Sequence, residues 1–254
     1  MSFFVGSALF ILGAIIASFI GVVVARLNTG QSFLRGRSRC DACNAPLSPR
    51  ALVPIVSFFS SKGRAQCCGA HLSLLAPGIE ALLGGLFVLS YLSFGLSTAL
   101  PFALLSLALL LALVLYDLLH QILPPVLLYP FVLVSGMVAF VDAPSLRFFY
   151  THALIALLIA ASLAALHFFS RGRVMGFADA PLALGLALLS GTSALAGFIF
   201  SFWIGAVVGI ALLARRPRGS RIGVEVPFAP FLAAGFLLAL FTQWNPFILI
   251  LTPR

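Results

Sequence analysis

Long apolar runs recur along the whole chain, and they constrain the fold more than any other feature. Hydrophobic residues make up 62% of the 254 residues and charged residues only 8%, with a mean hydropathy of +1.17. A membrane-spanning helix needs roughly 17–25 mainly apolar residues. Runs that fit this pattern, one of them short, lie at 3–25, 77–96, 99–116, 124–141, 151–169, 178–190, 194–214 and 228–251. The sequence therefore predicts an all-α, polytopic transmembrane helical bundle of about eight spans. The short run 178–190 could instead be half-buried or re-entrant.

Basic residues are distributed unevenly between the loops that join these runs. With eight spans and the N-terminus outside, 13 of the 15 Lys and Arg residues fall in the loops 26–76, 117–123, 170–177 and 215–227. Cytoplasmic loops of membrane proteins carry such an excess, so we expect these loops to be cytoplasmic. The net charge of +9 is then explained by topology, and we expect membrane lipids rather than nucleic acid as partners. The first run has no basic residue before it, which favours a retained helix over a signal peptide.

One long polar segment interrupts the apolar pattern. Residues 26–76 contain all four cysteines and seven of the basic residues. We therefore predict three parts: a first transmembrane helix at 1–25, a cytoplasmic cysteine-bearing loop domain at 26–76, and a transmembrane core at 77–254.

Two aspartates lie at the ends of apolar runs in a chain with only six acidic residues. Asp117 ends one run and Asp179 begins another, and the predicted topology puts both at the cytoplasmic boundary. An acidic residue at the edge of the hydrocarbon is costly and usually functional. Two close carboxyl groups share a proton, so one can take a proton from water while the other donates one. We expect a catalytic pair; the alternative is that Asp179 only caps its helix and Asp117 is solvated.

The sequence around both aspartates resembles a known family. LYDLLHQILPP resembles the first aspartate motif of type IV prepilin peptidases, and GFAD resembles their GxGD motif. The likeness extends to ASFIGVVVARL, to the cysteine-bearing segment and to VPFAPFLAAG. It implies a membrane aspartyl endopeptidase of the bacterial inner membrane with Asp117 and Asp179 as its catalytic pair. It also implies prepilin or pseudopilin substrates, cleaved at their leader on the cytoplasmic side, and in many members N-methylation with S-adenosylmethionine.

Four positions in or beside the expected site follow from this resemblance. Gly176 matches the first glycine of GxGD, Ala178 replaces the second, and Leu182 stands where many members carry lysine. We expect Ala178 to be a tolerated variant, because alanine is small, although it disfavours most conformations with positive φ. Glu80 is expected beside the site, where it would act on the new amino terminus or in methylation. Its alternative role is that of a carboxylate favoured at a helix start.

The cysteines predict a structural zinc site. Cys40 and Cys43 form a C-x-x-C pair, which is half of a common zinc site, and disulfides are disfavoured in a cytoplasmic loop. The family's second half is also C-x-x-C, and here Cys68 matches it while Ala65 has lost the other ligand. Cys67 is the candidate substitute and His71 the alternative ligand, giving Cys₄ or Cys₃His. A degenerated site with unligated thiols is the competing interpretation.

The function predicted from the sequence is cleavage of prepilin leaders, with methylation inherited from the family. Two other classes compete with it. A proton-coupled transporter or channel would use the two aspartates as a relay, but it would not explain the cysteine-bearing loop. An inactive scaffold for pilus assembly is suggested by Ala178.

Overall fold

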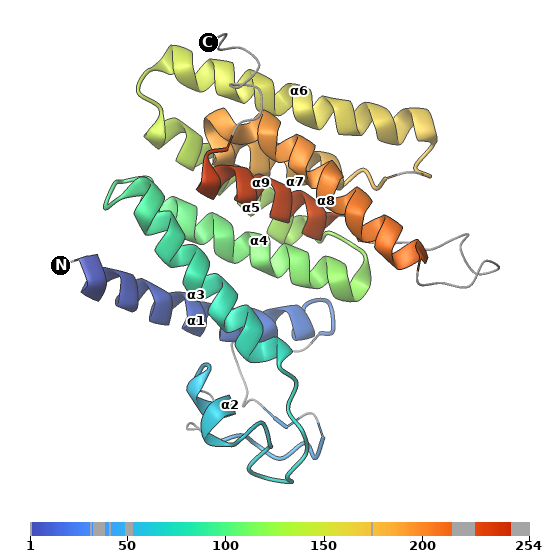
Figure 1. The fold of residues 1–254 in the computed structure, drawn as a ribbon. Coiled ribbons are helices and arrows are strands. Elements are labelled where there is room, and N and C mark those ends of the chain that lie inside the picture. Colours follow the sequence, from blue (N-terminus) through green and yellow to red (C-terminus); the bar gives the residue numbers. More distant parts are fainter. Residues whose placement is uncertain are drawn as a thin grey trace. The chain divides into compact units, whose positions relative to one another are not determined.

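The described residues form helices, several of them joined by short connections, and a cysteine-bearing segment between α1 and α3 (Figure 1). The structure, a computed structural model, describes residues 2–30, 32, 39–40, 42–48, 53–173, 175–214 and 227–244. Within these residues there is no strand, only two isolated bridges. The elements are α1 (Ser2–Arg26), α2 (Val56–Ser60), α3 (Leu75–Phe94), α4 (Leu100–His120), α5 (Pro125–Asp142), α6 (Leu146–Ser170), α7 (Asp179–Ser190), η2 (Gly191–Ser193), α8 (Ala194–Ala214) and α9 (Ala229–Thr242).

Several basic residues used to predict the topology lie outside the described residues. These are Arg35, Arg37, Arg50, Arg215, Arg216, Arg218, Arg221 and Arg254.

The chain divides into two compact units, Met1–Gly95 and Leu96–Arg254. The division groups α3 with α1 and the cysteine-bearing segment, whereas the sequence placed the start of the core at residue 77. Helices α1 and α3 pack together through glycines: a Cβ atom added to Gly13 would lie 2.8 Å from the Cα atom of Gly84. Small residues permit this approach of two apolar helices.

The second unit is centred on α7, which packs against α5, α6, α8 and α9. Nine of its 12 residues are buried, and Leu182, where the family often has lysine, is fully buried among them. Helices α8 and α9 approach closely, because an added Cβ on Gly235 would meet the backbone of Ser201. Buried polar residues are few, and Ser135 Oγ donates to Ser106 Oγ at 3.4 Å between α5 and α4. This packing fixes the two ends of α7.

Among the described residues, six helical segments are long and apolar enough to cross a membrane: Phe3–Arg26, Leu75–Phe94, Leu100–His120, Pro125–Asp142, Leu146–Ser170 and Asp179–Leu212. The last includes both α7 and α8, so the predicted runs 178–190 and 194–214 form one candidate. Alone, the 12 residues of α7 extend about 18 Å at 1.5 Å per residue, too short for a core of about 30 Å. Of the predicted run 228–251, the described helix is α9, with 14 residues.

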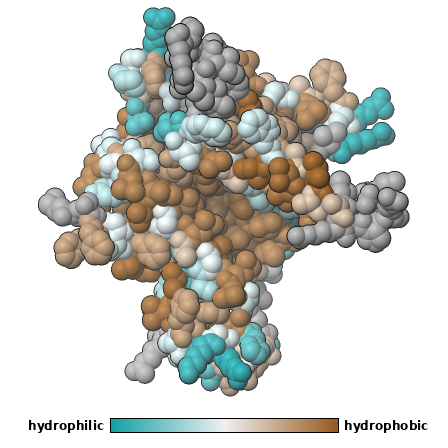
Figure 2. Space-filling view, viewed as in Figure 1, coloured by the Kyte–Doolittle hydropathy of each residue, from teal (hydrophilic) through white to brown (hydrophobic). Residues whose placement is uncertain are grey.

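Apolar side chains cover much of the surface of these helices (Figure 2). On α6, Leu154, Leu157 and Leu158 are more than half exposed, and on α8 so are Val207 and Ile210. Exposed leucines in such numbers are unfavourable in water and are expected of helices that face lipid. Both the helix lengths and the surface agree with the predicted polytopic helical bundle.

Candidate active site and metal centre

Asp117 and Asp179 are brought together at one cavity in the second unit. Asp117 lies in the last turn of α4, which is followed by Gln121 in the left-handed conformation, and Asp179 is the first residue of α7. Both side chains are buried, with exposed fractions of 6% and 7%. They line a cavity of about 650 Å³, together with Gln121, Ile122, Leu123, Gly172, Arg173, Met175, Gly176, Phe177, Ala178, Pro227 and Phe228. The two aspartates therefore face one space, as their positions at the run ends predicted.

The two carboxyl groups line one cavity, and each has different neighbours. The Oδ2 atom of Asp117 is buried and has no hydrogen-bond partner among the described residues. The backbone N–H of Ala229, at the start of α9, faces the Asp117 carboxyl. An unsatisfied buried oxygen at a cavity is available to a water molecule or a substrate.

The turn before Asp179 shows what the backbone requires at the two glycine positions of the family motif. A Cβ added to Gly176 would lie 3.5 Å from Asp179 Oδ2, which is ordinary van der Waals contact, so a side chain added there would pack against the carboxyl group. Ala178 has φ −66° and ψ −17°, a helical conformation that any L-residue adopts. The alanine is therefore accommodated without strain, and the family's second glycine is not required here by the backbone.

A residue that the sequence analysis did not identify also contacts this turn. His167, in the last turn of α6, has Nδ1 2.9 Å from the carbonyl oxygen of Met175. Because it precedes Asp179 by 12 residues and sits in an apolar helix, no local motif marks it.

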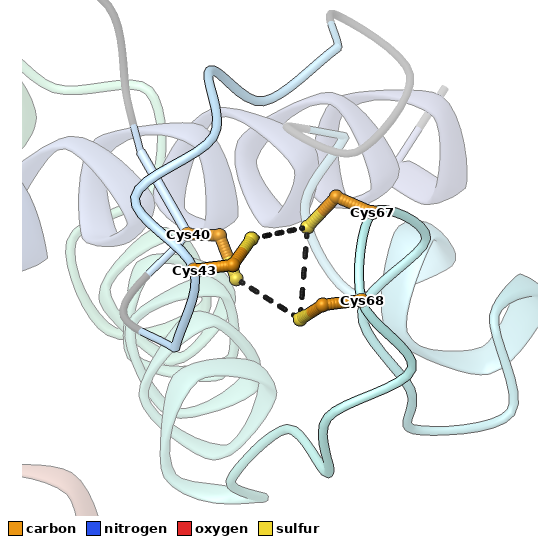
Figure 3. A group of neighbouring side chains, drawn as sticks. All are labelled: Cys40, Cys43, Cys67 and Cys68. Carbon is orange, nitrogen blue, oxygen red and sulfur yellow. Dashed lines mark hydrogen bonds between the residues drawn. The ribbon is translucent and has the colours of Figure 1, made fainter.

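The four cysteines converge in the first unit (Figure 3). Their sulfur atoms all lie within 4.8 Å of one another. The Sγ–Sγ distances are 3.4 Å for Cys43–Cys67, 3.8 Å for Cys40–Cys68 and 3.9 Å for Cys67–Cys68. A tetrahedral zinc with Zn–S bonds of about 2.3 Å has S–S edges of about 3.8 Å. Among the described residues the group contains Cys67 and not His71, so the donor set fits zinc as Cys₄.

The two halves of this cluster are the same backbone turn, repeated 25 residues apart. In the first half the Cys40 N–H donates to Ala45 O and the Asn44 N–H donates to Cys40 O. The second half has the same two bonds, from Ala65 N–H to Ala70 O and from Gly69 N–H to Ala65 O. Isolated bridges close both turns, Arg39 with Pro46 and Arg64 with His71. Ala65 thus occupies the place of Cys40, and His71 belongs to the closing bridge.

The four thiols are close enough to affect one another's ionisation. Backbone N–H groups of Cys43 and Ala42 lower the pKa of Cys40 to about 7, because they stabilise its thiolate. Hydrogen bonds with the sulfur atoms of Cys43 and Cys40 raise the pKa of Cys67 to about 12. Four thiolates so close together repel one another, and a divalent cation would remove that repulsion.

Glu80 is buried in the first unit and binds the backbone of the cysteine-bearing segment. Its Oε2 atom accepts a hydrogen bond of 2.7 Å from the N–H of Ile55. Ile55 has φ 60° and ψ −53°, and the Val56 N–H lies 2.5 Å from Pro54 O. This is a γ-turn with positive φ, which is rare and strained, above all for a β-branched residue. The carboxylate therefore holds a strained turn at the start of α2.

Comparison with known proteins identifies the family. Residues 11–94 match the model of the Bacterial Peptidase A24 N-terminal domain. The chain is 31% identical to the prepilin leader peptidase/N-methyltransferase of Bacillus subtilis over 92% of both chains. The chain belongs to the prepilin leader peptidase/N-methyltransferase family. The Pseudomonas aeruginosa member is 27% identical over 91% of this chain and 88% of its own. The Myxococcus xanthus member is 37% identical over 53% of this chain and 42% of its own. No solved structure matches.

Family membership confirms the resemblance predicted from the two aspartate motifs. With the six span-length helices, it also establishes a multi-pass membrane protein. The catalytic, metal-binding and site-adjacent roles of individual residues remain predictions.

Proposed function

We propose that this family member cleaves the N-terminal leader of type IV prepilins or pseudopilins, with Asp117 and Asp179 as the catalytic pair. The observation that carries the proposal is the burial of both carboxyl groups at one cavity in a chain of this family. Hydrolysis needs a water molecule to attack the scissile carbonyl. One aspartate would accept the proton of that water while the other donates its proton to the carbonyl oxygen. When the tetrahedral intermediate collapses, the first aspartate would pass the water's proton to the leaving amine, and the second would regain a proton from the diol hydroxyl.

The location of the pair fits a substrate whose own helix lies in the membrane. Asp117 and Asp179 are at the ends of apolar helices, and the cavity opens among loop residues such as Arg173 and Gln121. We propose that this boundary faces the cytoplasm of the bacterial inner membrane, with the N-terminus outside, because that orientation places the basic loops inside. The substrate helix could then stay in lipid while its leader enters the cavity.

We further propose that the four cysteines hold a structural zinc ion. The sulfur atoms of Cys40, Cys43, Cys67 and Cys68 would be its four ligands, because their separations suit a tetrahedral ion. Zinc bound there would link the two halves of the cysteine-bearing segment, and no step of the hydrolysis is assigned to it.

N-methylation of the new amino terminus, with S-adenosylmethionine as the methyl donor, is a second proposed activity. It rests on the relatives' printed names. Glu80 is proposed to act through the fold of the cysteine-bearing segment, because its carboxylate holds the Ile55 N–H.

Family membership favours the peptidase over the transporter and the scaffold. The scaffold was suggested by Ala178, and the helical φ of that residue removes this reason for expecting an inactive enzyme.

Cleavage of a prepilin that carries its leader, by the purified protein in liposomes, tests the peptidase. The variants Asp117→Asn and Asp179→Asn keep the side-chain volume and remove the acid–base group, so we expect rates lower by about 10²–10⁴-fold. Asp142→Asn is the matched control, because Asp142 is an exposed acid at the end of α5 and does not line the cavity. An uncut precursor with the parent protein, or parent-like rates in both variants, would refute the proposal.

A further inference from the structure

His167 connects the end of α6 to the turn that carries Asp179. Helix α6 ends at Ser170, and the chain reverses through Arg171 and Gly172, both with positive φ. The Gly172 N–H donates to His167 O at 2.9 Å. The imidazole then reaches forward, with Nδ1 2.9 Å from Met175 O. His167 thus bonds to both Gly172 and Met175 in the connection between α6 and α7.

The hydrogen bond places a proton on Nδ1 of the imidazole. A carbonyl oxygen can only accept, so Nδ1 must carry the proton that is shared with Met175 O. The ring also packs edge-on against Phe177, with centroids 5.7 Å apart at 64°. Phe168 packs on Phe177 as well, at 5.8 Å. The ring is therefore held on one side by a hydrogen bond and on another by an aromatic contact.

Met175 and Phe177 lead directly into the site. Met175 is buried, and both residues line the cavity with the two aspartates. The next turn is closed by the Asp179 N–H, which donates to Gly176 O at 3.3 Å. The position of Asp179 therefore depends on where the Met175 carbonyl is held.

A simpler role for a histidine here would be its favourable charge at a helix C-terminus, where basic side chains often bond the last carbonyls. The Nδ1 atom of His167 instead contacts a carbonyl eight residues further along the chain. That contact orders the connection rather than capping the helix.

We propose that His167 is a positioning residue for Asp179: its Nδ1–H holds the Met175 carbonyl, so that the turn Gly176–Ala178 presents the Asp179 carboxylate to the cavity. This role rests on the proposed peptidase function. It assigns to His167 no contact with substrate.

The test compares His167→Ala with His167→Asn in the liposome cleavage assay. The Asn side-chain N–H can replace Nδ1–H, whereas Ala removes the donor. We expect kcat to fall about tenfold in His167→Ala, as for the loss of one well-placed hydrogen bond, with KM within about twofold of the parent. His167→Asn should recover kcat to within about threefold. His120→Ala is the matched control, because His120 is an exposed histidine at the end of α4 that packs on Tyr116 outside the cavity lining.

Hydrogen exchange of residues 175–180 in the same samples gives a second readout that needs no activity. Exchange should rise in His167→Ala and return toward the parent in His167→Asn. The proposal is overturned by parent-like kcat in His167→Ala, by a loss confined to KM, or by failure of Asn to restore both kcat and protection. A parent protein that does not cut prepilin refutes the peptidase function instead, and exchange then still decides whether His167 orders the turn.

Discussion

Moving one sulfur ligand by two residues should leave the metal centre intact. The Cys67→Ser variant removes a ligand, whereas Ala65→Cys combined with Cys67→Ser returns it to the position equivalent to Cys40. The two turns have the same hydrogen bonds and the same closing bridge, so a cysteine at 65 should point its sulfur into the cluster as Cys40 does.

The size of the effect follows from the chain that the metal links. The sulfur contacts join residues 24 and 28 positions apart. Closing a loop of that length removes chain entropy worth about 3.5 kcal/mol, by the estimate used for covalent cross-links. Since about 1.4 kcal/mol is a tenfold change, loss of the metal should lower amide protection in residues 53–73 roughly 300-fold, up to the limit set by other contacts.

Metal analysis and hydrogen exchange on the purified protein check this prediction. We expect zinc in the parent, little in Cys67→Ser, and recovery of both zinc and protection in the double variant. His71→Ala should keep the metal, because His71 lies outside the cysteine group. The reasoning fails if Cys67→Ser keeps parent levels of zinc and protection, or if the double variant recovers neither.

Two further substitutions address residues beside the proposed chemistry. Ala178→Gly should keep the cleavage rate within about twofold, because Ala178 already has a helical conformation. The same substitution should lower the free energy of unfolding by at most about 1 kcal/mol. A large gain in the cleavage rate, measured in liposomes, would contradict this prediction. Glu80→Ala should destabilise the turn at Ile55 by about 1.5–3 kcal/mol, the usual worth of a hydrogen bond to a charged group, and raise exchange in 53–60. Glu80→Gln keeps an acceptor and should lose less. Equal loss of cleavage in both, with unchanged exchange, would point to a chemical role of the carboxylate instead.

Much of the candidate site could be predicted because it lies at boundaries between apolar and polar sequence. Asp117 and Asp179 end and begin apolar runs, and helices whose ends lie at one level bring such residues together. The choice of Cys67 over His71 could not be made from spacing alone. It depends on the backbone turn, because Ala65 begins the same hydrogen-bonded turn as Cys40. Backbone hydrogen bonds hold this turn whether its first residue is a cysteine or an alanine.

Other contacts depend on the path of the chain in three dimensions. His167 meets Met175 only because Arg171 and Gly172 reverse the chain. The hydrogen bond from Ile55 to Glu80 joins residues 25 positions apart, and neither local sequence predicts it. The end of α7 is different, because the break between the predicted runs 178–190 and 194–214 already marks it in the sequence, and Gly191 in that break has φ 52°.

The shortness of α7 has a consequence for how the chain enters the membrane. Since α7 cannot cross the hydrocarbon alone, the turn at Gly191–Ser193 has to lie where lipid offers no hydrogen bonds, and such a turn is tolerated only inside protein. Ser193 Oγ donates to Gln243 Oε1 at 3.2 Å, and Ser190 Oγ lies 3.5 Å from Phe236 O. The polar partners of this turn therefore come from α9 and from the residue that follows α9. We expect α7 and α8 to be inserted together and to stay incompletely folded until α9 is synthesised. Chains truncated before α9 should therefore be degraded or retained by the insertion machinery, and stable insertion of such chains would contradict this order of assembly.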